Sequence, residues 1–132
     1  MPTPRVRCRW TSPGGEWAVR ARVERLVEPA LLVLLRERPR HGYDLLEHIP
    51  ALVGDGAEVD LGNLYRLLRG LEAEGLVSSR WVVDAPGPAR RMYTLTAAGS
   101  RLLEAWATAL RATGTVITTL LARFDRHERG TP

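Results

Sequence analysis

Apolar residues recur with helical spacing along VDLGNLYRLLRGLEAEGL, residues 59–76. The positions i, i+3, i+4 and i+7, which share one face of a helix, hold only leucine: Leu64, Leu67, Leu68 and Leu71. Asp60 stands before this stripe at the N-cap position, and Gly75 stands after it at the C′ position. The pattern therefore predicts one capped helix with a buried face.

Two shorter helices are predicted before this one. The first begins with Pro29 at position N1, is apolar on nearly all sides, and ends before Pro39. The second is HGYDLLEHIP, residues 41–50, with Pro50 as its stop. Its inward-facing residues are Leu45, Leu46 and Ile49.

The hydrophobic period changes after Leu76. VSSRWVV (77–83) and RRMYTL (90–95) hold β-branched and aromatic residues at strand-like spacing, and DAPGPA lies between them. These segments predict a β-hairpin. Three helices followed by a hairpin is the order of a winged helix-turn-helix, in which the hairpin is the wing.

A long helix is predicted at the C-terminus, capped by Thr96 and running to about His127. Its apolar positions alternate between spacings of three and four, which is a heptad seam of the coiled-coil type. A helix of about thirty residues spans roughly 45 Å, more than one small domain needs. We therefore expect it to mediate dimerisation, although its seam can also fold back on the first helix of the same protomer. The predicted dimerisation residues are Leu103, Leu110, Ile117, Leu120 and Phe124.

The expected fold is mainly α with a small β-hairpin: a winged helix-turn-helix domain followed by a long dimerisation helix. Residues 1–16 contain three Pro and two Gly without periodicity, so they predict a flexible arm. Trp10 and Trp17 are unusual in such a segment, and we expect them to pack on the domain or on a partner. The remaining boundaries are 17–96 for the DNA-binding domain, 97–127 for the helix and 128–132 for a flexible tail.

Charge and cysteine content limit the class of protein. Lys and Arg together number 19, all of them Arg, against 15 Asp and Glu, which gives a net charge of +4. A basic balance favours a polyanionic partner, but only weakly at this magnitude. The single cysteine, Cys8, cannot form an internal disulfide. No apolar run is long enough to cross a bilayer and the N-terminus has no apolar signal region, so a soluble cytoplasmic protein is expected.

The outer face of the 61–74 helix is small and cationic. In a winged helix-turn-helix this helix enters the major groove, where arginines contact guanine or phosphates and Asn63 pairs with adenine. Tyr65 is placed to donate to a phosphate, and the wing arginines contact phosphates or the minor groove. The alternatives are that these arginines are merely solvated, or that the chain is a winged-helix interaction module without DNA binding. The predicted contacts with double-stranded DNA are Asn63, Tyr65, Arg66, Arg69, Arg90 and Arg91.

Enzyme classes find little support in the sequence. The three histidines, His41, His48 and His127, are scattered, and no Cys or carboxylate joins the first two at metal-ligand spacing. Nucleophile-elbow and phosphate-binding loop motifs are missing from the sequence. We therefore expect no catalytic residues, no metal and no cofactor.

Three segments resemble the successive signature blocks of the PadR family of bacterial transcriptional regulators. They are LLVLLRERPRHGYDLLEHI, GNLYRLLRGLEAEGLV and GPARRMYTLTAAG, and the resemblance runs from about Pro29 to Phe124. It implies a dimeric repressor, often of a neighbouring gene, that binds an inverted-repeat operator and is released by a small ligand. One departure is Asn63, where the family usually has Thr before Leu-Tyr, so the operator need not follow a family consensus.

Trp106 is the candidate ligand-contact residue. It lies in the predicted seam, so two copies can approach each other near the centre of a two-fold dimer. Some family members resemble this arrangement in binding flat aromatic compounds between aromatic side chains at the dimer interface. The alternative is that Trp106 fills the core between the terminal and first helices, against Leu31 and Leu35.

Overall fold

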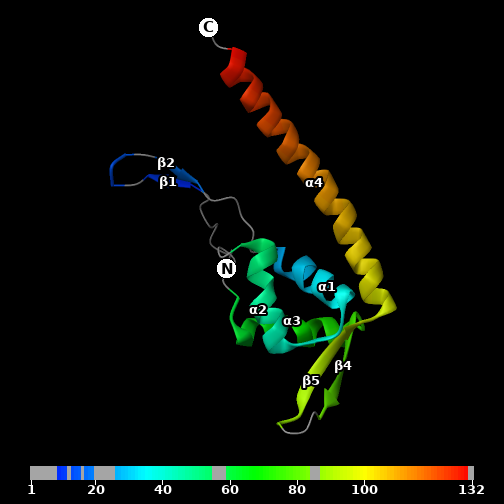
Figure 1. Ribbon diagram of the computed structural model, residues 1–132. Coiled ribbons are helices and arrows are strands. Elements are labelled where there is room, and N and C mark those ends of the chain that lie inside the picture. The colour runs from blue at the N-terminus through cyan, green and yellow to red at the C-terminus, as the bar shows by residue number, and fades with distance from the viewer. Residues whose placement is uncertain are drawn as a thin grey trace, which may run out of the picture.

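The computed structural model describes residues 9–11, 13–15, 17–19, 26–54, 59–83 and 87–130. Three helices, α1 (Val27–Glu37), α2 (Gly42–Val53) and α3 (Leu61–Ala73), pack together, and a small antiparallel sheet lies at one end of them (Figure 1). The long helix α4 (Ala97–Gly130) leaves this body and extends well beyond it (Figure 1). The predicted fold class is confirmed.

The core lies where the apolar faces of the three helices meet the base of the sheet. Helix α1 is almost enclosed, which accounts for its nearly continuous apolar sequence. The leucine stripe of α3 is buried as predicted, with Leu64 and Leu68 at 0% exposure, while Leu67 is half-buried at its edge. The buried core residues are Leu31, Leu32, Leu34, Leu35, Leu45, Ile49, Leu64, Leu68, Leu71, Val77, Tyr93 and Leu103.

Prolines at two helix ends behave differently from the prediction. Helix α1 begins at Val27, so Pro29 is its third residue rather than its first. The N–H groups of the first turn have no intrahelical partner, so proline is tolerated there. Helix α2 continues past Pro50 to Val53, because this proline removes only one backbone hydrogen bond. The helix ends at Gly54, which has a φ of 80° and donates its N–H to the Pro50 oxygen at 2.8 Å.

Both predicted caps of α3 are confirmed. The Asp60 carboxylate accepts a hydrogen bond from the backbone N–H of Asn63 at 2.7 Å. At the other end, Gly75 has a φ of 76° and donates to the Glu72 oxygen at 3.0 Å. Leu76 then donates to the Leu71 oxygen at 2.9 Å, which completes a Schellman motif. These caps fix the length of α3 and the point where the chain turns into the wing.

The wing is the predicted hairpin. Strands β4 (Val77–Val82) and β5 (Arg90–Leu95) pair antiparallel, with Trp81 opposite Arg91. A third strand, β3 (Arg40–His41), pairs with the other edge of β5 and was not predicted. Two residues are too short to show a period of two, so the sequence held no signal for β3.

Strand β3 is anchored by a buried arginine. Arg40 is 5% exposed, and its guanidinium donates to the Leu34 oxygen at 2.9 Å, to Asp44 at 2.7 Å and to Glu37 at 2.9 Å. Burial raises the pKa of the Asp44 carboxyl, but the hydrogen bond and charge of Arg40 outweigh it and hold the pKa below its ordinary value. The ionised Asp44 therefore stabilises the fold above that ordinary pKa, and its contribution is lost as the pH falls through the lowered value.

The N-terminal segment contains a short hairpin where a flexible arm was expected. Strand β1 (Arg9–Thr11) pairs antiparallel with β2 (Trp17–Val19), so the expected boundary at residue 16 divides one paired unit. Residues 1–8, 12 and 16 of the expected arm lie outside the described residues, as do the side chains of Trp10 and Trp17.

Helix α4 has 34 residues and a length of about 50 Å. Thr96 caps it as predicted, accepting from the N–H of Gly99 at 3.1 Å. The helix continues to Gly130, past the expected end at residue 127, and residues 131–132 of the expected tail are outside the described part. In the part of the chain that the structure describes, every helix is too short or too polar to cross a membrane.

Candidate nucleic-acid interface

The outer face of α3 is open to solvent. Asn63, Arg66 and Arg69 are exposed, and Tyr65 is half-buried at the side nearest α2. The leucine stripe on the opposite face holds the helix against the core, so these polar side chains have a rigid support. The structure therefore brings the four α3 candidates together on one surface.

The leading end of α3 carries a chain of polar contacts. Asp60 accepts from the side-chain amide of Asn63 at 3.1 Å, in addition to its capping bond. The Asn63 oxygen in turn accepts from the Arg66 guanidinium at 3.3 Å. The cap thus orients Asn63, and Asn63 restrains Arg66, at the N-terminal end of α3.

A groove of about 590 Å³ separates α3 from the wing and the start of α2. Three arginines line it, Arg69, Arg90 and Arg91, and Glu72 is the one carboxylate in the described part of its lining. Four aromatic side chains also line it: Tyr43, Tyr65, Trp81 and Tyr93.

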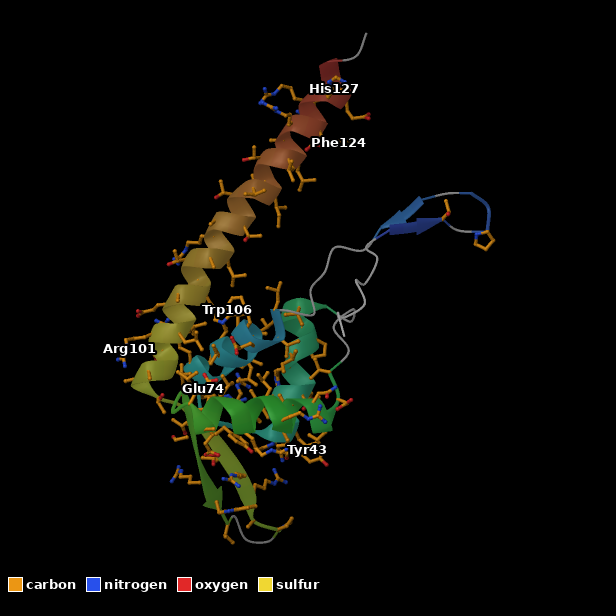
Figure 2. All side chains as sticks on the ribbon, turned by 180° about the vertical axis from the view of Figure 1, so that it is seen from behind. Tyr43, Glu74, Arg101, Trp106, Phe124 and His127 are labelled. Carbon is orange, nitrogen blue, oxygen red and sulfur yellow. The ribbon has the colours of Figure 1, made fainter. Side chains whose placement is uncertain are left out.

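Three of these aromatics, all except Tyr65, were not among the predicted contacts, and two of the three are exposed. Tyr43 is 64% exposed and Trp81 is 65% exposed, which is unusual for side chains of this size. Figure 2 shows Tyr43 at the side of α3 that faces the wing. Tyr93, by contrast, is 4% exposed, and its burial raises the pKa of the phenol, so it remains neutral at the floor of the groove. The available signal for Tyr43 was its position outside the apolar face of α2, whereas Trp81 shares the face of β4 that carries the buried Val77, so its exposure had no signal in the sequence.

Gly42 provides the space that Tyr65 occupies. A Cβ atom at Gly42 would lie 2.8 Å from the Tyr65 hydroxyl and 3.0 Å from two of its ring carbons. The ring therefore packs directly on the backbone at the start of α2. This contact gives a physical reason for glycine between His41 and Tyr43.

We expect Gly42→Ala to weaken DNA binding more than it weakens the fold. The added methyl pushes the end of a flexible side chain rather than backbone, so we expect a loss of unfolding free energy of about 1 kcal/mol. The displaced hydroxyl no longer reaches its position beside the groove. Chemical denaturation and DNA titration on the same variant separate the two effects. Tyr65→Phe, which removes only the hydroxyl, is the control. If Gly42→Ala lost no more binding free energy than unfolding free energy, or if Tyr65→Phe bound DNA like wild type, the Tyr65 hydroxyl would have no role in binding.

The two wing arginines differ in their surroundings. Arg90 is exposed, and one of its guanidinium nitrogens lies 3.5 Å from Nε2 of His41. Arg91 donates to Ser79 at 2.8 Å and to Glu72 at 3.3 Å, and its guanidinium lies 5.6 Å from the centre of the Trp81 ring. The sequence alone does not distinguish the two arginines, whereas in the described contacts only Arg91 meets a carboxylate.

Carboxylates do lie near a histidine, contrary to the expectation from spacing. Ligand atoms of Asp44, Glu47 and His48 fall within 4.8 Å of one another. The Asp44 oxygens, however, already face Arg40 at 2.7 Å, Arg38 at 3.7 Å and His48 at 3.4 Å. A metal ion at this position would have to displace the buried Arg40 contact, so the group is explained by the anchoring of β3.

The apolar stripe of α4 divides into two parts. Its beginning packs on its own protomer: Leu103 is 5% exposed, and Leu102 and Trp106 lie partly buried against the core. Leu103 is therefore a correction to the predicted dimerisation set, because α1 and the core already cover it. From residue 110 onward the stripe is exposed, and Val116 and Leu121 widen it beyond the prediction. Its exposed members are Leu110 (37%), Val116 (58%), Ile117 (52%), Leu120 (65%), Leu121 (58%) and Phe124 (61%).

Trp106 lies at the junction between these two parts (Figure 2). Its indole N–H donates to the Glu28 carboxylate of α1 at 2.7 Å. This contact agrees with the alternative in which Trp106 packs between the terminal and first helices. The ring is nevertheless only half-buried within one protomer.

The sequence profile of the Transcriptional regulator PadR-like family matches residues 31–105, from within α1 to the first turns of α4. The Negative transcriptional regulator PadR of Bacillus subtilis (strain 168) is 29% identical over 82 residues, which is 62% of this chain. The chain spans 45% of the length of that relative.

Two solved structures illustrate the structural similarity. Bacillus subtilis PadR in complex with operator DNA has a TM-score of 0.56 and 29% identity, covering 63% of this chain and 46% of that one. A PadR family transcription regulator from Clostridium difficile R20291 has a TM-score of 0.64 over 72% of this chain and 97% of that one. At 21% identity, the second similarity bears on the fold alone.

Proposed function

Because the chain belongs to the PadR-like family of transcriptional regulators, we propose that it binds an operator in double-stranded DNA and represses transcription there. Such a protein acts in the cytoplasm and needs neither a catalytic centre nor a cofactor. The observation that carries the proposal is the exposed cationic face of α3 beside the arginine-lined groove under the wing. The operator complex of the Bacillus subtilis relative supports it, because 63% of this chain is similar in structure to part of that protein at 29% identity.

The arrangement suits the two kinds of contact that DNA recognition requires. Asn63 and Arg66 lie at the leading end of α3, where side chains reach base edges in the major groove. Arg90 lies at the start of β5 next to the wing tip, where a phosphate or the minor groove is within reach. The alternative, an interaction module that does not bind DNA, does not explain why cationic side chains lie on both α3 and the wing.

A gel-shift titration with the DNA upstream of its own coding region tests the proposal. We expect a shift that survives excess unrelated DNA and weakens as salt is raised. An equal affinity for unrelated DNA would support only non-specific binding. The absence of any shift at low salt would favour the interaction module.

We expect Arg66→Ala and Arg90→Ala to have different effects. Arg66→Ala should cost about 1–3 kcal/mol of specific binding and relax preference at one position of each half-site. Arg90→Ala should weaken binding to all sequences and reduce the slope of log affinity against log salt by about one. Binding measured across an operator library and a salt series distinguishes them. If Arg90→Ala changed base preference while Arg66→Ala did not, the roles of helix and wing would be reversed.

We also propose that the repressor is a homodimer that reads an inverted repeat. The exposed stripe of α4 supports this proposal, because six large apolar side chains on one helix are costly to leave in water. A two-fold dimer would present two copies of α3 to half-sites on one side of the duplex.

A small planar aromatic effector is the third part of the proposal, with Trp106 as its contact. Trp106 lies one turn before the exposed stripe, so in a two-fold dimer packed on that stripe the two Trp106 side chains would lie near each other. We expect planar aromatics to quench the emission of a variant that keeps only Trp106 and to lower operator affinity in parallel. A Trp106→Leu protein that folds, dimerises and responds as before would exclude this contact and leave Trp106 a core residue held by Glu28.

A further inference from the structure

We propose that Glu72 and Arg91 are positioning residues that fix the wing at a set angle to α3, and that Arg91 is not a phosphate contact. The proposal is the reverse of the expectation that both wing arginines bind DNA. Its DNA-binding consequences rest on the proposed function, whereas its structural consequences do not.

The two residues meet through a serine. Ser79 of β4 donates its hydroxyl hydrogen to one oxygen of Glu72 and accepts from Nε of Arg91 at 2.8 Å. The terminal nitrogen of Arg91 donates to the other oxygen of Glu72 at 3.3 Å. One carboxylate of α3 is therefore joined to both strands of the wing.

This network lies above the apolar base of the wing. Val77 and Tyr93 are buried on the same side of the hairpin and bind the wing to the core. On the same face, Ser79 lies directly opposite Tyr93, and Arg91 lies one side-chain pair nearer the tip, opposite Trp81. Without the Glu72 contact, the apolar base would be the remaining link between the wing and α3 among the described contacts on this face, so the part of the hairpin beyond the β3 pairing would be less constrained.

The charges are consistent with this role. Among the described residues that line the groove, Glu72 is the only carboxylate, and a carboxylate facing DNA would repel phosphates. Arg91 neutralises it, with its planar fork divided between Ser79 and Glu72 and its face toward Trp81 at 5.6 Å. Arg90 and Arg69 line the same groove without such a carboxylate partner among the described contacts.

Glu72→Gln separates this proposal from simple electrostatics, because the two predict opposite signs. Removing a negative charge from a DNA-facing groove should strengthen binding if only net charge matters. If Glu72 positions the wing, the same substitution should weaken specific operator binding by about three- to tenfold, as expected for a coupled charged pair. Non-specific DNA affinity should not fall.

Arg91→Ala provides the second arm, with Arg90→Ala as the matched control. We expect Arg91→Ala to lower specific affinity like Glu72→Gln while leaving the salt slope near that of wild type. The double variant should be no worse than Arg91→Ala alone, because both remove the same interaction. Arg90→Ala should reduce the slope by about one.

Hydrogen exchange without DNA provides the third arm. Amide exchange in residues 77–95 should be faster in Glu72→Gln and in Arg91→Ala than in wild type, and unchanged in Arg90→Ala. If exchange rises in the two variants but neither they nor the wild-type protein bind DNA, the proposed function fails while the positioning role stands. Unchanged exchange, tighter operator binding by Glu72→Gln, or a lower salt slope in Arg91→Ala would each overturn the proposal.

Discussion

Gly99→Ala is expected to destabilise the protein by about 3 kcal/mol, the upper end of the usual cost of overpacking a tight contact. Gly99 lies in the first turn of α4, where a Cβ atom would stand 2.1 Å from the backbone oxygen of Leu76 and 2.5 Å from a methyl carbon of Leu95. The obstructing oxygen belongs to backbone that is itself fixed, since it accepts from the N–H of Thr96 at 3.2 Å. To relieve the clash, α4 must move away from the turn that joins α3 to the wing.

Gly114→Ala is the matched control for this prediction. It changes the same residue type in the same helix, but nothing lies within 4 Å of the added Cβ. Since alanine is the better helix former, we expect it to stabilise the protein by up to about 1 kcal/mol. Urea denaturation at one fixed protein concentration measures both variants, because the stability of a dimer depends on concentration. Equal stabilities for the two would show that α4 does not approach Leu76 this closely in solution.

The second large effect is expected from charges placed in the exposed stripe of α4. Leu120 and Phe124 are 65% and 61% exposed in one protomer, so replacing both by Glu should cost little within that protomer. In the proposed dimer these positions face a partner helix, where buried, unpaired carboxylates oppose association. We expect monomers by light scattering. We also expect operator affinity to fall by about a hundredfold or more, because binding of the two half-sites is no longer linked.

A control with the same spacing uses Thr118→Glu and Ala122→Glu, which lie off the apolar stripe of the same helix. This pair adds the same charge and should leave the dimer intact. If both double variants stayed dimeric, the partner surface would lie elsewhere on the molecule. If both became monomeric, added charge rather than the stripe would explain the effect.

Elements whose signals are local were predictable from the sequence. The leucine stripe and caps of α3 lie within its own residues, so Asp60 and Gly75 mark its ends without reference to any distant segment. The hairpin likewise follows from two strand-like segments around a proline-rich tip. Its strands are consecutive in the chain, so their antiparallel pairing requires no distant segment. The family could also be predicted from the sequence, because the three signature blocks contain these local features in the order that the family has them.

Features that depend on which distant residues meet were not predictable. Strand β3 forms because its backbone pairs with β5 and because the Arg40 side chain donates hydrogen bonds to Leu34, Glu37 and Asp44. Its two residues carry no pattern of their own. Helix α2 likewise continues past Pro50 to Val53, which packs against the distant residues of the core.

The candidate site shows the same division. Its location on α3 and the wing followed from the sequence, because helical spacing and strand order assign residues to faces. What each side chain does there was decided by its neighbours in space. Arg90 and Arg91 are adjacent and chemically identical in sequence, yet only Arg91 meets Glu72, Ser79 and Trp81. Leu103 and Leu110 lie two turns apart on one stripe, yet α1 covers only Leu103. Periodicity determines which side of an element a residue occupies, but tertiary packing determines what lies opposite it.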